Sequence, residues 1–122
     1  MDNGPARKSN YSAQLQKSSE LIGDPFEVST VRQEDFEAYK GMMEGDDVTQ
    51  SGPKPSSQSP RGHQGPAAFL ILASGLDEHG SGSRSPLKYS HLDIASSAGS
   101  LPLPATGSPV LALAEQYLLK HL

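Results

Sequence analysis

Residues 30–45, TVRQEDFEAYKGMMEG, combine a helical spacing of apolar side chains with charges that suit the ends of a helix. Phe36, Tyr39 and Met43 are spaced i, i+3 and i+7, which places them along one side of an α-helix. Acidic residues stand in the first turns and a lysine follows them, in agreement with the helix dipole. The pattern predicts an amphipathic helix that begins at a Thr30 cap and ends at a glycine. An isolated helix of about fifteen residues is marginal in water, so its apolar side is a candidate partner-binding surface.

A second helix is predicted upstream from its end signals. It follows Asn10, a favourable cap residue, and stops before Gly23. Tyr11 and Leu15 share its apolar side. Together, the two predicted helices make residues 10–45 the best candidate for an ordered segment.

The C-terminal segment 108–122 has a similar organisation. Ser108 suits the cap position and Pro109 the first helical position. The residues that follow form a broad apolar face, on which Leu111 and Leu118 are further candidates for partner binding.

The segment AAFLILASGL, residues 67–76, is uncharged and strongly apolar. Its pattern suits a buried strand, a short buried helix or an exposed, aggregation-prone segment, and periodicity does not separate these alternatives. The surrounding segments are rich in Gly, Ser and Pro. They are predicted to form a flexible tail at 1–9, a linker at 46–66 and a flexible, motif-bearing segment at 77–107.

Composition changes this picture from a folded domain to separate helices. Leu, Ile, Val and Phe total 24 of the 122 residues, Gly contributes 12 and Pro 10, and Trp is absent. Little apolar surface is therefore available to offset the entropy lost when the chain is ordered. We expect a mostly disordered protein with short α-helices and no stable globular domain; the alternative is a small, loosely packed all-α unit.

Charge and cysteine content narrow the class of partner and the compartment. The net charge is −4 and there is no dense run of Lys or Arg, so nucleic-acid binding is not expected. The absence of cysteine suits a reducing compartment. No apolar signal segment is found near the N-terminus, and the longest apolar run, residues 67–73, is too short to span a bilayer. These features predict a cytoplasmic protein that is small enough to enter the nucleus.

No residue constellation in the sequence indicates catalysis. The four histidines are isolated and lack the spacing of metal ligands. The glycines lack the strand and helix context of a phosphate-binding loop. We therefore expect no enzymatic activity, no cofactor and no metal.

Short tyrosine and serine motifs carry more functional information. Residues 87–92, LKYSHL, resemble the inhibitory motif read by SH2 domains, with Tyr89 as the phosphorylation candidate. A phosphate there would add charge that an SH2 arginine can bind. Tyr39 has a methionine three residues later and is a second candidate, although it is also expected as a core residue on its helix. Ser85 precedes a proline and fits the pattern of a cyclin-dependent kinase.

Asp24, Pro25 and Phe26 form a DPF tripeptide, which resembles the motif that docks on the appendage domain of clathrin adaptors. A turn fixed by the proline would present the phenyl ring to a pocket. The alternative is structural, with a helix cap followed by a core phenylalanine.

These observations favour a non-enzymatic, adaptor-type interaction protein. Its short helices would order on a partner protein, and its flexible segments would carry linear motifs, including phosphotyrosine motifs. Partners of SH2 or clathrin-adaptor type are expected, without nucleic acid and without a transmembrane segment. The alternatives are a structural component of a cytoskeletal assembly and a trafficking factor that binds clathrin adaptors.

Overall fold

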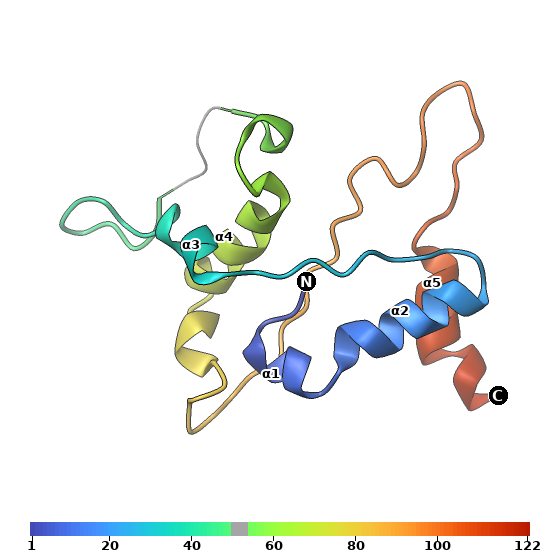
Figure 1. The fold of residues 1–122 in the computed structure, drawn as a ribbon, viewed down its shortest axis with the longest axis horizontal. Coiled ribbons are helices and arrows are strands. Elements are labelled where there is room, and N and C mark those ends of the chain that lie inside the picture. Colours follow the sequence, from blue (N-terminus) through green and yellow to red (C-terminus); the bar gives the residue numbers. More distant parts are fainter. Residues whose placement is uncertain (50–53) are drawn as a thin grey trace. The chain divides into compact units, whose positions relative to one another are not determined.

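The computed structural model of the protein describes residues 1–49 and 54–122, and the regular elements in these ranges are helices (Figure 1). The chain forms two compact units, one of residues 1–9 and 29–91 and the other of residues 10–28 and 92–122. The α-helices are α1 (Gly4–Lys8), α2 (Tyr11–Leu21), α3 (Gln33–Glu37), α4 (Gly65–Ala73) and α5 (Val110–Tyr117). The same described ranges contain the short 3-10 helices η1 (Ser56–Gln58), η2 (Gly62–Gln64), η3 (Leu76–His79) and η4 (Leu119–His121).

The expectation of a mostly disordered chain is wrong, because the helices pack against one another. In one unit α2 packs on α5, and in the other α3 packs on α4. The buried apolar residues are mainly small: Ala6, Ala67, Ala68 and Ala112, together with Leu15 and Ile71. Counting large apolar residues underestimates such a core, because small side chains let helices approach closely and bury their backbones. The described parts of the chain are therefore ordered helical units, and the prediction of intrinsic disorder is wrong for them.

Helix α4 resolves the alternatives for the apolar segment 67–76. Pro66 lies in its first turn, where a missing N–H is tolerated. Ala67, Ala68 and Ile71 are buried, and the helix is followed by Gly75 with a φ of 70°, a left-handed conformation that glycine adopts without strain. The apolar segment is a half-buried helix.

The N-terminal half of α4 packs closely against Tyr39. The rings of Phe69 and Tyr39 meet edge to face, with centroids 6.0 Å apart and planes at 67°. The Tyr39 hydroxyl lies over Gly65, where a Cβ atom would come within 2.2 Å of it. This position therefore requires glycine for steric reasons, because even a methyl group would push the ring away.

We predict that Gly65→Ala will destabilise the α3–α4 unit by about 1 kcal/mol, because the new methyl group displaces the Tyr39 ring from its packed position. The Tyr39 ring resonances and urea unfolding should both report the change. Gly82→Ala is the matched control, since a Cβ at Gly82 meets nothing within 4 Å. Equal stability of the two variants would contradict the close contact between residue 65 and the Tyr39 ring.

Helix α3 is much shorter than the helix predicted over residues 30–45. It ends at Glu37, and an isolated antiparallel bridge joins Lys40 to Val48. The chain turns back between these two residues, and a Cβ at Gly41 would lie 2.2 Å from the Asp46 carbonyl oxygen. Only glycine permits so close an approach of two backbones, so the residues after α3 form a loop and not further helical turns.

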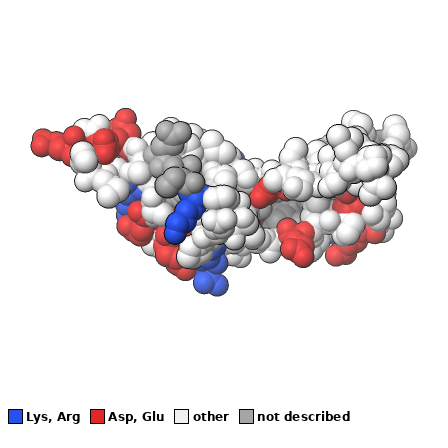
Figure 2. Space-filling model, turned by 90° about the horizontal axis from the view of Figure 1, so that it is seen from above, with Lys and Arg blue, Asp and Glu red and all other residues white. Residues whose placement is uncertain are grey.

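The loop at residues 41–47 is the acidic tip of its unit. Its side chains are exposed throughout, including Glu44, Asp46 and Asp47. Figure 2 shows acidic side chains gathered at the left end of the view. Met42 and Met43 belong to the same loop and are 82% and 78% exposed.

Helix α2 carries two neighbouring buried serines, and Ser18 is hydrogen-bonded to α5. Both Ser18 and Ser19 are fully buried. The Ser18 hydroxyl donates to Gln116 Oε1 on α5 at 2.7 Å, and Lys120 Nζ donates to Ser18 Oγ at 2.5 Å. Because each buried hydroxyl is hydrogen-bonded, its desolvation is compensated. Ser18, a polar residue on the otherwise apolar side of α2, is therefore part of the contact with α5.

The other predicted segments are distributed as follows. The 10–45 segment contributes to both units, with α2 in one and α3 in the other. The 1–9 segment contains α1, and the 46–66 segment contains η1 and η2; residues 50–53 of that predicted linker lie outside the described residues. Across the described ranges, the helices are too short or too polar to cross a membrane.

Candidate functional site

The DPF tripeptide is part of the packing of α5 and not a free peptide. The Asp24 carboxylate accepts the Ser108 hydroxyl at 2.5 Å and, more weakly, the Ala112 amide at 3.4 Å. Ala112 lies in the first turn of α5, which has no capping side chain next to it in sequence. Asp24 therefore caps α5 from a distance in sequence and stabilises the positive end of that helix.

The backbone of Phe26 is hydrogen-bonded to two side chains of α2. Its amide donates to Ser19 Oγ at 3.0 Å, and its carbonyl oxygen accepts Gln16 Nε2 at 3.0 Å. The ring is half-buried, whereas Pro25 is exposed. The two outer residues of the tripeptide are thus engaged in hydrogen bonds within the unit.

Residues 110–122 of this unit include several exposed apolar side chains, which together we call the α5 apolar face. Leu111 and Leu118 are 58% and 63% exposed. Other exposed apolar residues of the same segment are Val110, Tyr117, Leu119 and Leu122. These two leucines, predicted from the sequence as partner-binding residues, are seven residues apart on α5 and its C-cap. Large apolar side chains exposed together on one segment are a common feature of protein–protein contact sites.

Phe36, Tyr39 and Met43 do not form the single stripe that the sequence predicts. Phe36 lies on α3 and is half-buried, and Tyr39 follows α3 and packs on Phe69 of α4. Met43 lies in the exposed loop beyond the bridge. Of these three residues, Tyr39 packs within its unit, Phe36 is half-buried and Met43 is freely accessible.

An ion pair that the sequence did not reveal fixes the start of α3. Arg61 donates to both Asp35 carboxylate oxygens, at 2.7 and 2.9 Å, and to the carbonyl oxygen of Thr30 at 2.7 Å. The Asp35 carboxylate also accepts the Arg32 amide at 2.7 Å, so it is the residue that caps α3. Hydrogen bonding from the Arg61 guanidinium holds the pKa of Asp35 below its ordinary value.

Tyr89 is half-buried, and its backbone is paired with the N-terminal residues. Asn3 donates its amide to the Tyr89 carbonyl oxygen at 3.0 Å, and the Tyr89 amide donates to Asn3 Oδ1 at 3.1 Å. The adjacent residues continue this pairing, with the His91 amide donating to the Met1 carbonyl oxygen at 2.8 Å. Burial raises the pKa of the Tyr89 hydroxyl. An SH2 domain reads an extended peptide, so this pairing would have to open before residues 87–92 could be bound.

Ser85 is exposed, in contrast to Tyr89. Its backbone carbonyl oxygen lies 2.8 Å from His79 Nδ1. The Ser85 hydroxyl is not part of this contact and is accessible.

The Asn3 side chain, which connects Tyr89 to α1, was not identified from the sequence. The Asn-Gly-Pro start of α1 was the available signal, because Asn3 Oδ1 also accepts the Ala6 amide at 3.1 Å as an N-cap.

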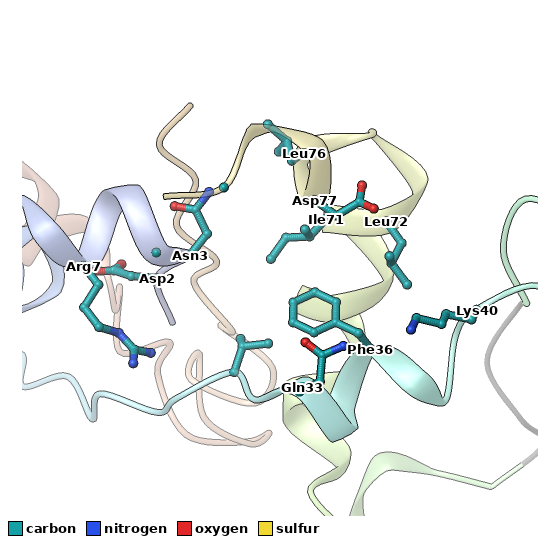
Figure 3. Close-up of a pocket in the computed structure, with 13 residues that line it drawn as sticks. Asp2, Asn3, Arg7, Gln33, Phe36, Lys40, Ile71, Leu72, Leu76 and Asp77 are labelled. Atoms are coloured by element: carbon teal, nitrogen blue, oxygen red, sulfur yellow. The ribbon is translucent and has the colours of Figure 1, made fainter. Parts of the chain in front are cut away.

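A cavity of about 500 Å³ lies within the unit that contains α1, α3 and α4 (Figure 3). Phe36 of α3 and Ile71 and Leu72 of α4 contribute apolar side chains to its wall. Arg7 of α1 contributes a cationic side chain. Among the described residues, no group of three or more His, Asp or Glu side chains is placed to hold a metal ion.

Comparison with known proteins gives one informative similarity. The chain is 41% identical over 121 residues, 99% of its length, to the Caenorhabditis elegans protein named "Putative aminopeptidase W07G4.4". It spans 23% of the length of that relative. No family model matches the chain, and no solved structure matches it.

Proposed function

We propose that this chain is a non-enzymatic interaction module that associates with the larger part of an aminopeptidase-type protein through its α5 apolar face. The observation that carries the proposal is the concentration of exposed apolar side chains at residues 110–122. Such a face is stabilised when another apolar surface covers it. The module is preformed, because α5 is already capped by Asp24 and packed on α2.

The choice of partner rests on the relative. Nearly all of the chain aligns with less than a quarter of the C. elegans protein. In that protein, the region similar to this chain is joined to a much longer polypeptide. This longer polypeptide is our candidate for the surface that covers the α5 apolar face. Interfaces of this type place apolar side chains at their centre and polar ones at the rim.

The proposal predicts that the remaining polypeptide of the C. elegans protein, expressed without the aligned region, binds this chain in trans. Light scattering after size exclusion should show a complex with wild-type chain. The double substitution Leu111→Glu, Leu118→Glu should weaken binding by about tenfold or more, because it places charge at the centre of the contact.

Lys17→Glu is the matched control, because Lys17 is an exposed residue of α2 and receives the same new carboxylate. It should bind like the wild-type chain. Circular dichroism of each variant checks that the helices are retained. Absence of a wild-type complex, or equal binding by the double variant, would contradict the proposed function.

A cytoskeletal or clathrin-adaptor partner remains a prediction from sequence alone. The adaptor alternative would require Asp24 and Phe26 to leave their contacts with Ser108, Ser19 and Gln16. For this reason the α5 apolar face is the better supported surface.

A further inference from the structure

The cavity between α1, α3 and α4 has two chemically different sides. Figure 3 shows Phe36 and Ile71 directed into the space from one side, with Arg7 on the opposite side. Ile71 is buried and Phe36 half-buried, so the apolar side is held in place by the packing of α3 on α4. A volume of about 500 Å³ falls in the range of small-molecule sites.

The hydrogen-bonding groups of the polar side differ in their availability. Asn3 uses both ends of its amide within the protein, donating to the Leu87 carbonyl oxygen at 2.8 Å and accepting two backbone amides. Asp2 is 4% exposed and accepts the Ser90 hydroxyl at 2.7 Å. Arg7 is exposed, and it takes part in none of the salt bridges found within the described ranges. Its guanidinium is the polar group best able to meet a ligand.

We propose that this cavity binds a small amphipathic monocarboxylate with an aromatic or branched aliphatic body. The body would lie against Phe36 and Ile71, where apolar area is removed from water. The carboxylate would accept two parallel hydrogen bonds from the Arg7 guanidinium, a geometry that arginine favours. This inference is independent of the α5 apolar face, which belongs to the other unit.

The remaining charges at the cavity set its selectivity. Two acidic residues, the buried Asp2 and the exposed Asp77 of η3, line the cavity and disfavour a second negative charge on a ligand. Lys40 also reaches the wall, but its ammonium is 2.6 Å from the Glu37 carboxylate. The site therefore prefers one carboxylate to two, and a carboxylate to an amide.

The test is a titration of the isotope-labelled full chain with three probes, followed by NMR chemical shifts. The probes are 3-phenylpropanoate, its neutral amide 3-phenylpropanamide and the dicarboxylate phenylsuccinate. We expect shifts in residues around Arg7, Phe36 and Ile71, with the monocarboxylate binding about tenfold more tightly than either of the others.

Arg7→Gln should lower the affinity for 3-phenylpropanoate to that for the amide and leave amide binding unchanged. Lys8→Gln is the control, because Lys8 is the neighbouring exposed cation and does not line the cavity. Unperturbed spectra of both variants outside the site establish that folding is retained. Three results would each overturn the proposal: equal affinity for acid and amide, an equal loss in Lys8→Gln, or no shifts at the cavity up to about 10 mM probe.

Discussion

Replacing Asp24 by alanine is expected to lower the stability of the α2–α5 unit by about 2–3 kcal/mol, the range of a charge-assisted hydrogen bond and a helix cap together. The carboxylate connects the turn after α2 to Ser108 and to the first turn of α5. Without it, the Ser108 hydroxyl loses its acceptor and α5 loses its cap. Residue-specific hydrogen exchange should show faster exchange in α5 than in the α3–α4 unit.

Two further substitutions separate the Asp24 contact from a general effect of charge. Asp24→Asn retains an oxygen acceptor and should lose less stability than Asp24→Ala. Asp93→Ala is the matched control in the same unit, because the exposed Asp93 accepts only a local amide, that of Ala95 at 3.1 Å. It should change stability by less than about 0.5 kcal/mol. A loss in Asp93→Ala equal to that in Asp24→Ala would refute the capping role.

Asp35→Asn is expected to destabilise the α3–α4 unit by about 1–2 kcal/mol at neutral pH, because the bidentate ion pair with Arg61 is lost while the shape is kept. The effect should depend on pH. The pKa of Asp35 is lowered in the folded state, first by the hydrogen bond from Arg61 and further by the Arg32 amide. A lowered folded-state pKa means that the carboxylate stabilises the fold fully above its unfolded pKa, near pH 4.

Below about pH 4, this contribution is lost as the pH falls through the folded-state pKa of Asp35. Wild-type stability should therefore fall more steeply with acid than that of Asp35→Asn, and the two should converge. Urea titrations at a series of pH values, followed by the Tyr39 resonances, measure the difference. Parallel pH profiles of the two proteins would show that the ion pair contributes nothing.

Local sequence signals indicated where helices lie better than they indicated how long the helices are or which residues they contact. Helix α2 lies inside the span predicted from Asn10 to Gly23, and α5 inside the predicted 108–122 segment. The signals at residues 30–45 were misleading, because helix periodicity continues past Glu37 while the glycine at 41 allows the chain to turn back. The same continuing periodicity led to the prediction that Met43 shares an apolar stripe with Phe36 and Tyr39.

The contacts that define the two units could not be predicted, because they join residues far apart in sequence. Asp24 meets Ser108, Asp35 meets Arg61, and Asn3 pairs with Tyr89. None of these pairs has a local spacing that would identify it. The same limitation explains the error about disorder, since buried serines and alanines indicate a core only after their partners are known.

Hydrogen exchange of the full chain, measured free and with the remaining polypeptide of the C. elegans relative, tests the central claim most directly. The free chain should show protection in α2, α4 and α5 together, because each is packed. Adding the partner polypeptide should increase protection at residues 110–122 and leave the α3–α4 unit unchanged. An unprotected free chain, or new protection elsewhere than the α5 apolar face, would contradict the account.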